Sequence, residues 1–256
     1  LLTKVGVYAL MRITFLLFPA ERDTLALVIA VIAALTMIIG ALGALAQTDF
    51  RRLLGYLVIS GIGIMFAGIA LASHGGVTGT IFYAVHSMVV MTALYLASGL
   101  AARAAGGFSI ATSSGIYSSH VFLAGLTLML FFAVSGLPPF SGFWPKVILV
   151  KASLDVGAWW LATAILLSGF LTTIAVGRVW ILSYWRPAAA EAGPDVETAQ
   201  MSLVVDDLPL VMLTALVVIF GLFPEQILAL SQLGSDQVLN PVDYVRSVFP
   251  LAGGAQ

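Results

Sequence analysis

The chain has 256 residues, of which 61% are hydrophobic and only 9% are charged. A soluble domain typically carries about 25% charged residues, so this composition predicts an integral membrane protein. The net charge of −1 gives no bulk attraction to nucleic acid, and a sequence without cysteine excludes disulfides, a thiol nucleophile and a thiolate metal site.

The apolar runs predict an all-α membrane protein with about seven transmembrane helices. A spanning helix needs about 20 apolar residues, and polar stretches separate runs of that length along the chain. The predicted segments are residues 1–19, 24–46, 53–73, 77–102, 120–136 with 140–155, 158–184 and 208–224. We therefore expect a transmembrane domain over 1–224, followed by an interfacial tail of amphipathic helices over 225–256.

The first segment is apolar from its first residue, with neither an initiator methionine nor the charged start of a signal peptide. This pattern is typical of a chain that begins inside or at the edge of a transmembrane helix. We expect the N-terminal part of the parent protein to be missing or to be a separate piece.

The fifth segment contains an interruption, "SGLPPFSGFWPK", at residues 135–146. Its three prolines cannot donate backbone hydrogen bonds, and each flanking half is short for a full crossing. We interpret 120–136 and 140–155 as one broken helix, since two separate crossings would raise the count to eight. Irregular backbone at membrane depth is tolerated where it lines a cavity, and broken helices mark transport sites. A simple proline kink would explain the prolines but not Lys146, which follows them. We expect water and the carbonyls freed between Gly136 and Trp144 to stabilise the charged form of Lys146.

Basic residues near the helix ends predict the orientation. The loops after the second, fourth and sixth crossings hold Arg51, Arg52, Arg103 and Arg186. Such loops are typically cytoplasmic, so the C-terminus is expected outside. The opposite side has Arg22, which two acidic neighbours balance, and Arg246 in the tail. Eight crossings would put the last loop on the wrong side.

Every ionisable residue inside an apolar segment is basic. These residues are Lys4, Arg12, His86, Lys146, Lys151 and Arg178. A charge at the bilayer centre costs about 2.5–3.5 kcal/mol on insertion scales. Long side chains near helix ends avoid this cost by reaching the interface, which suits Arg12, Lys151 and Arg178. Lys4, His86 and Lys146 lie deeper.

Burial disfavours the charged form of an amine, so a buried lysine exchanges its proton nearer neutral pH than an exposed one. Two lysines and a histidine on separate helices therefore predict a proton path, and they would repel Na⁺. The candidates for lining this path are Ser60, Thr92, Ser141 and Lys151. The alternative is that the two lysines are structural and that His86 is a core histidine whose ring nitrogens are hydrogen-bonded. The three histidines lack metal-ligand spacing, so we expect no metal and no cofactor.

Four stretches in this order resemble the proton-translocating antiporter-like subunits of respiratory complex I and of the Mrp sodium/proton antiporters. They are "LTKVGVYALMRI", "TDFRRLLGYLVISGIG", "IFYAVHSMVVMTALYLASG" and "SGLPPFSGFWPK". The tail "QVLNPVDYVRSV" is most similar to the D subunits of the Mrp antiporters.

The resemblance implies crossings eight to fourteen of a fourteen-helix subunit built from two inverted halves. Lys4 would be the central lysine that links the halves, His86 a relay residue, and Lys146 the terminal exchange residue. The sequence departs from the family at Met91, where members often have a lysine, and at Gly61, where some have a histidine. Waters would have to bridge both positions.

The implied function is proton translocation within a multisubunit Na⁺/H⁺ antiporter of the bacterial inner membrane, without enzymatic chemistry. The implied partners are a large homologue of the A type, small membrane subunits and the lipid bilayer, with protons and Na⁺ as the transported ions. One alternative is the equivalent subunit of a redox-driven pump, such as complex I or a membrane-bound hydrogenase. Another is a structural fragment that only scaffolds an assembly.

Overall fold

The computed structural model describes residues 2–16, 22–187 and 207–240, and these residues form helices with no strand among them. The helices are α1 (Leu2–Leu16), α2 (Arg22–Ala46), α3 (Phe50–Ala70), α4 (His74–Ala105), α5 (Ile116–Ser119), α6 (Val121–Ser135), α7 (Phe143–Asp155), α8 (Trp159–Val179), the π-helical turn η1 (Trp180–Trp185), α9 (Leu208–Leu222) and α10 (Glu225–Leu239). The predicted all-α class is confirmed.

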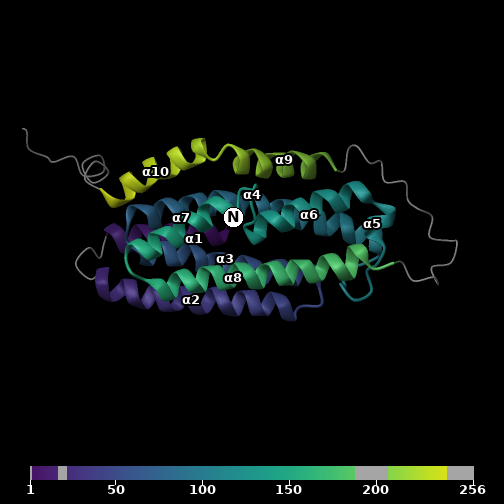
Figure 1. Ribbon diagram of the computed structural model, residues 1–256, viewed down its shortest axis with the longest axis horizontal. Helices are drawn as coiled ribbons and strands as arrows, with labels where there is room; N and C mark the ends of the chain where they lie inside the picture. The colour runs from purple at the N-terminus through teal and green to yellow at the C-terminus, as the bar shows by residue number, and fades with distance from the viewer. Residues whose placement is uncertain (1, 17–21, 188–206, 241–256) are drawn as a thin grey trace, which may run out of the picture.

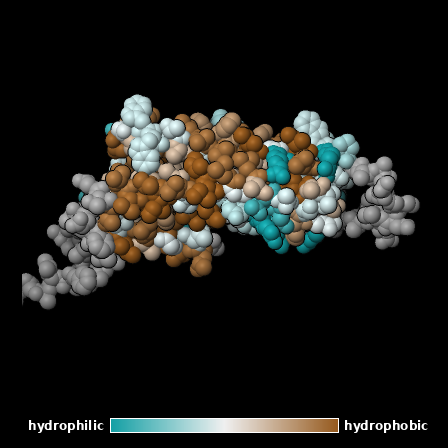
Figure 2. All heavy atoms as spheres, turned by 90° about the horizontal axis from the view of Figure 1, so that it is seen from below, coloured by the Kyte–Doolittle hydropathy of each residue, from teal (hydrophilic) through white to brown (hydrophobic). Residues whose placement is uncertain are grey.

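The helices form an elongated bundle around α4, which contacts α3, α6, α7, α9 and α10 (Figure 1). Apolar side chains cover much of the face shown in Figure 2, and hydrophilic ones gather toward the end where α5 lies.

By length and composition, four helices in the described residues could cross a membrane, or five if the bent pair α9–α10 counts as one span. The chain is therefore a multi-pass membrane protein. These criteria do not establish the predicted count of seven, because α1, α6 and α7 are shorter.

Polar caps set the boundaries of the central helices. The Asp49 side chain accepts a hydrogen bond from the Arg52 amide at 2.9 Å at the start of α3. Ser73 does the same for the Gly76 amide at 3.1 Å at the start of α4. Capping side chains satisfy amides of the first turn that have no partner within the helix. Both helices therefore begin three residues before the predicted 53 and 77, because a hydropathy run omits its polar cap.

The predicted break separates α6 from α7. Gly136, with a φ of 84°, ends α6 in the left-handed region that glycine adopts most readily. The peptide bond between Pro138 and Pro139 is cis. The break is wider than predicted, since helix resumes only at Phe143. Pro145 does not interrupt α7, because the first turn of a helix tolerates proline.

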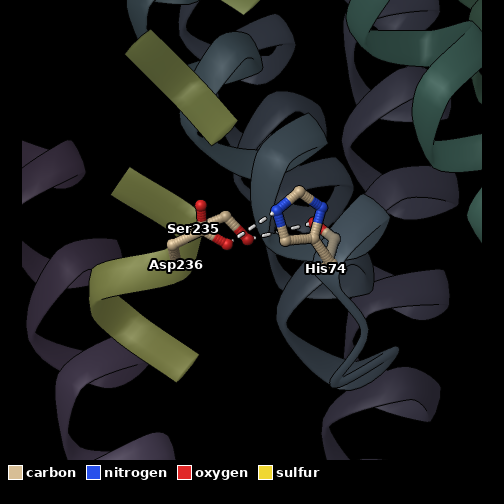
Figure 3. A network of polar contacts seen from close by, with 3 residues as sticks. All are labelled: His74, Ser235 and Asp236. Carbon is tan, nitrogen blue, oxygen red and sulfur yellow. Dashed lines mark hydrogen bonds and ion pairs between the residues drawn. The ribbon is translucent and has the colours of Figure 1, made fainter. Parts of the chain in front are cut away.

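A second break, which we call the elbow, bends α9 and α10 by 77° around Phe223 and Pro224. Beyond it, α10 packs against α4. Figure 3 shows the polar end of this contact, where the Ser235 hydroxyl donates to the His74 carbonyl at 3.1 Å. Asp236 Oδ1 also lies 3.1 Å from His74 Nε2. The remainder of the predicted tail, residues 241–256, lies outside the described residues.

The loops predicted to share one side of the membrane meet at one end of the bundle. Arg186 donates to the backbone carbonyls of Ala111 and Ser113. The guanidinium of Arg51 lies 3.9 Å from the centre of the Phe108 ring. The loop that follows α4 is thus bound both to the start of α3 and to the end of the α8–η1 helix.

Candidate functional site

Buried apolar side chains form two separate clusters, one toward each end of the bundle. On α4, Tyr83 belongs to one cluster and Val90 to the other, and His86 lies between them. Buried polar side chains occupy the same interval on neighbouring elements. This polar layer contains Ser60, His86, Ser87, Ser135, Ser141, Ser168 and Thr172. It crosses the bundle at the depth of the α6–α7 break.

His86 and Ser141 meet in the polar layer. His86 Nδ1 lies 2.8 Å from Ser141 Oγ, although the two residues are 55 positions apart in the chain. Only 2% of His86 is exposed. The backbone of Gly142 passes close to the ring, because a Cβ there would lie 3.0 Å from His86 Cε1 and Nε2 and would overlap the Ala133 carbonyl. The break thus gives a buried imidazole a hydroxyl partner that can accept or donate a proton.

Lys146 binds the C-terminal end of α6. Its Nζ donates to the carbonyls of Ser135 at 2.6 Å and Val134 at 3.2 Å. The last carbonyls of a helix have no partner within it, and they carry the negative end of its dipole. We expected the carbonyls of residues 136–144 in this role. The amides that follow α6 instead turn back to the carbonyls of Phe132 and Ala133, which leaves the next two carbonyls of α6 for the lysine.

Two glycines allow Lys146 to reach these carbonyls. A Cβ at Gly136 would lie 2.6 Å from Lys146 Cδ and 2.9 Å from its Nζ, inside van der Waals contact. A Cβ at Gly169, on α8, would lie 3.6 Å from the same Nζ, which is an ordinary contact. The lysine therefore lies between the break and the middle of α8.

Lys4 is half-buried beside a cavity of about 360 Å³ between α1, α3 and α4, and this cavity is open to the surface of the bundle. The cavity is lined by Thr3, Lys4, Val58, Ser87, Met88, Met91, Thr92, Tyr95 and Leu96. Such a volume holds several waters, and hydroxyl groups on its wall can hydrogen-bond to them. Ser87 directly follows His86, so the cavity extends from Lys4 to the segment of α4 that carries the histidine. Thr92, one of the predicted lining residues, is on this wall.

Of the two other predicted lining residues, Ser60 is in the polar layer but bonds to α2, and Lys151 is at the surface. The Ser60 hydroxyl donates to the Met37 carbonyl at 3.0 Å, which joins α3 to α2. The Lys151 side chain is 78% exposed, and its Nζ lies 3.5 Å from the Asp155 carboxylate. The structure therefore brings Ser141 to His86 and Thr92 to the Lys4 cavity, but it brings neither Ser60 nor Lys151 to them.

The remaining basic residues of the apolar segments bind nearby polar groups. Arg12 Nε donates to the Tyr8 hydroxyl at 2.9 Å. The Tyr8 hydroxyl therefore accepts from the arginine one helical turn away. Arg178 donates to the Leu45 carbonyl near the end of α2.

Sequence reasoning missed Tyr83. Its ring packs edge-on against His86, with 5.8 Å between the ring centres. A Cβ at Gly61 would lie 3.2 Å from the Tyr83 hydroxyl, so the tyrosine faces the position where some family members have a histidine. The only signal in the sequence was the i−3 spacing of Tyr83 from His86 on one helix face.

The described residues contain no group of three or more His, Cys, Asp or Glu side chains that could hold a metal ion. The groups gathered at the break are amine, imidazole, hydroxyl and backbone carbonyl. The amine and the imidazole can bind and release a proton, and the hydroxyl and carbonyl groups can hydrogen-bond to them.

Comparison with known proteins identifies the family. Residues 1–172 match the family described as "NADH:quinone oxidoreductase/Mrp antiporter, TM". The chain belongs to this family. Among curated members, the chain is 34% identical to the D subunit of the Na(+)/H(+) antiporter from Alkalihalophilus pseudofirmus and 28% identical to that from Bacillus subtilis. Each match covers 97% of this chain and 50% of the relative, so the chain spans about half the length of these relatives.

Solved structures of the NADH:quinone oxidoreductase/Mrp antiporter family share the fold. A chain of the Mrp complex from Dietzia sp. DQ12-45-1b superimposes with a TM-score of 0.85 at 26% identity, over 96% of this chain and 53% of that one. A chain of respiratory complex I from Thermus thermophilus gives 0.77 at 26% identity, over 93% and 50%. The membrane-bound sulfane sulfur reductase, at 22% identity and a TM-score of 0.82, shows the same fold.

Proposed function

We propose that the chain forms half of a proton-translocating subunit in a multisubunit Na⁺/H⁺ antiporter. One observation carries this proposal. The His86–Ser141 hydrogen bond lies at the same helix break as Lys146, whose amine binds the carbonyls at the end of α6. The relatives named as D subunits of Na(+)/H(+) antiporters support the choice of antiport.

In this proposal, the Val134 and Ser135 carbonyls stabilise Lys146 when it is protonated, and its long stem lets the amine leave them when it is neutral. His86, with Ser141, passes protons within the polar layer. Waters in the Lys4 cavity supply the connection toward α1. No continuous series of side chains joins these groups among the described contacts, so water completes the path.

The topology we propose has seven crossings, with α6–α7 and α9–α10 each counted once. The end that carries Arg51 and Arg186 is cytoplasmic, because basic loops favour that side, and the C-terminus is outside. The proposed transmembrane domain extends from residue 1 to residue 239, past the predicted boundary at 224, because α10 forms the second half of the last crossing. The proposed location is the bacterial inner membrane. The proposed partners are a large A-type homologue and small membrane subunits.

The test compares Lys146→Ala with Lys151→Ala in the full-length protein, assembled in its complex. Lys151 is a matched control on the same helix, since its side chain is exposed and pairs with Asp155. We expect Lys146→Ala to abolish proton-coupled antiport in membrane vesicles with equal complex content, and Lys151→Ala to retain it. Lys146→Arg should also fail, because arginine stays protonated. Near-normal antiport in Lys146→Ala would reduce the break to a structural kink.

A second function, the equivalent subunit of a redox-driven proton pump, is favoured by the similarity to T. thermophilus complex I. The polar layer would serve both functions, and only the energy source would differ. Purification of the complex from its native membrane distinguishes them. Small antiporter subunits should copurify in the first case, and quinone-reductase or hydrogenase subunits in the second.

A further inference from the structure

The elbow between α9 and α10 lies against the α6–α7 break. The Trp144 indole N–H donates to the Gly221 carbonyl at 2.8 Å, and a Cβ at Gly221 would overlap the Pro139 carbonyl. The break has 15 helical residues before it and 13 after it, so roughly 20 Å of helix separates it from either end of the bundle. Figure 1 shows both interruptions at the same position along the long axis. The elbow is therefore near mid-depth.

Glu225 begins α10 directly after the elbow, and its side chain points away from the chain's own core. Both Glu225 and Gln226 are exposed. The exposed side chains around them are apolar, namely Leu222 at 54%, Phe223 at 67% and Leu230 at 68%. A carboxylate and an amide thus lie within an apolar surface near the middle of the bundle.

An ionisable group at this depth normally faces a bundle interior or pairs with another group. The ion pairs found in the described residues are His74–Asp236 and Lys151–Asp155, and Glu225 takes part in neither. The positive end of the α10 dipole favours a carboxylate in the first turn. That effect explains why an acidic residue begins this helix. It does not explain why the side chain is exposed among apolar side chains near mid-depth.

We propose that the elbow surface, formed by Leu222, Phe223, Glu225, Gln226 and Leu230, binds a transmembrane helix of a partner subunit. That helix places a lysine or arginine against Glu225, and its apolar side chains pack on the leucines and Phe223. Charge complementarity selects a basic group on the partner helix, because no basic side chain among the described residues of this chain forms an ion pair with Glu225. The proposal rests on the proposed function only in assuming a multisubunit membrane complex.

Residues 1–256 contain no cysteine, so Gln226→Cys creates the one attachment site of this segment, and any cysteine elsewhere in the full-length protein is replaced by serine first. A benzophenone maleimide on this thiol, irradiated in the assembled complex, should crosslink to a membrane helix of another subunit. Mass spectrometry of the product should identify a peptide that contains lysine or arginine. A crosslink to any other segment of the same polypeptide, to lipid alone, or to a helix without a basic residue would overturn the proposal.

Substitution of Glu225 supplies a second readout that does not depend on the crosslinker. Glu225→Lys should release the partner subunit on native gels in mild detergent, whereas Gln237→Ala, at an exposed position of α10 outside the elbow surface, should retain it. Exchange of the charges, with the crosslinked basic residue changed to glutamate in the Glu225→Lys background, should restore assembly. Failure of this rescue would refute the ion pair.

These measurements report subunit contacts rather than transport. If Lys146→Ala keeps normal antiport while Gln226→Cys crosslinks as expected, the proposed function fails and the elbow contact stands. If Lys146→Ala abolishes antiport while the crosslink is absent, the elbow contact fails alone.

Discussion

Replacing Gly136 with alanine should displace Lys146 from the α6 carbonyls. A Cβ at this position would lie 2.6 Å from Lys146 Cδ, and the atom that must move is the end of a flexible side chain. The backbone itself is a second obstacle, because Gly136 has a φ of 84°. The substitution therefore combines a local backbone cost with the loss of the lysine's hydrogen bonds.

The two contributions have different sizes and different dependence on Lys146. An L-residue in the left-handed region costs about 1–2 kcal/mol. A hydrogen bond to a charged group contributes about 1.5–3 kcal/mol to stability, so displacing the ammonium adds a cost of that order. In a Lys146→Ala background, only the backbone cost of the Gly136→Ala change should remain.

The assay is a double-mutant cycle on the detergent-solubilised complex, with unfolding of this subunit followed by heat or denaturant. We expect Gly136→Ala to cost less stability when Lys146 is already alanine, by more than the roughly 0.5 kcal/mol within which independent sites add. Gly169→Ala is the matched control, since its Cβ would make only an ordinary 3.6 Å contact with Lys146 Nζ. Equal costs in both backgrounds would refute the steric argument.

Two further predictions concern polar side chains. Ser141→Ala removes the partner of His86 Nδ1, so it should slow antiport in vesicles without changing metal content, whereas Ser153→Ala, whose hydroxyl bonds within its own helix, should not. Equal rates for the two variants would remove Ser141 from the proton path. At the α4–α10 contact, Asp236→Asn should cost about 0–1 kcal/mol and lose this effect in about 1 M salt. Ser235→Ala should cost about 0.5–1.5 kcal/mol at any salt concentration, and a salt-dependent loss would contradict its assignment as a neutral hydrogen bond.

The sequence predicted the helices and the break well because both depend on local chemistry. Long apolar runs can satisfy their backbone in a membrane only as helices, which located α2, α3, α4 and α8. The prolines and Gly136 located the interruption between α6 and α7. Lys146 was predicted to contact freed carbonyls, but which carbonyls depends on how the amides after α6 turn back, and residue type does not specify that.

The contacts that the sequence did not specify join segments far apart in the chain. The Ser60 hydroxyl, which we considered for the proton path, binds a carbonyl of α2. A Cβ at Gly40 would lie only 2.5 Å from the Ser60 amide nitrogen, so the two helices approach closely there. Glu225 begins the segment that was predicted to be an interfacial tail, and only the contact of Gly221 with the break shows the depth of that position. The short helix α5 lies in a polar stretch without hydrophobic periodicity.

The contacts at the arginine end impose an order on biosynthesis. The loop after α4 obtains its final hydrogen bonds from Arg186, which follows Ser113 by 73 residues, and the Gly115 amide also donates to the Arg186 carbonyl at 2.8 Å. A ribosome delivers this loop before α6, α7 and α8 exist. Until the α8–η1 helix has been inserted, the loop can bond only to the start of α3, and its bonds to Arg186 mark the completion of that end of the bundle.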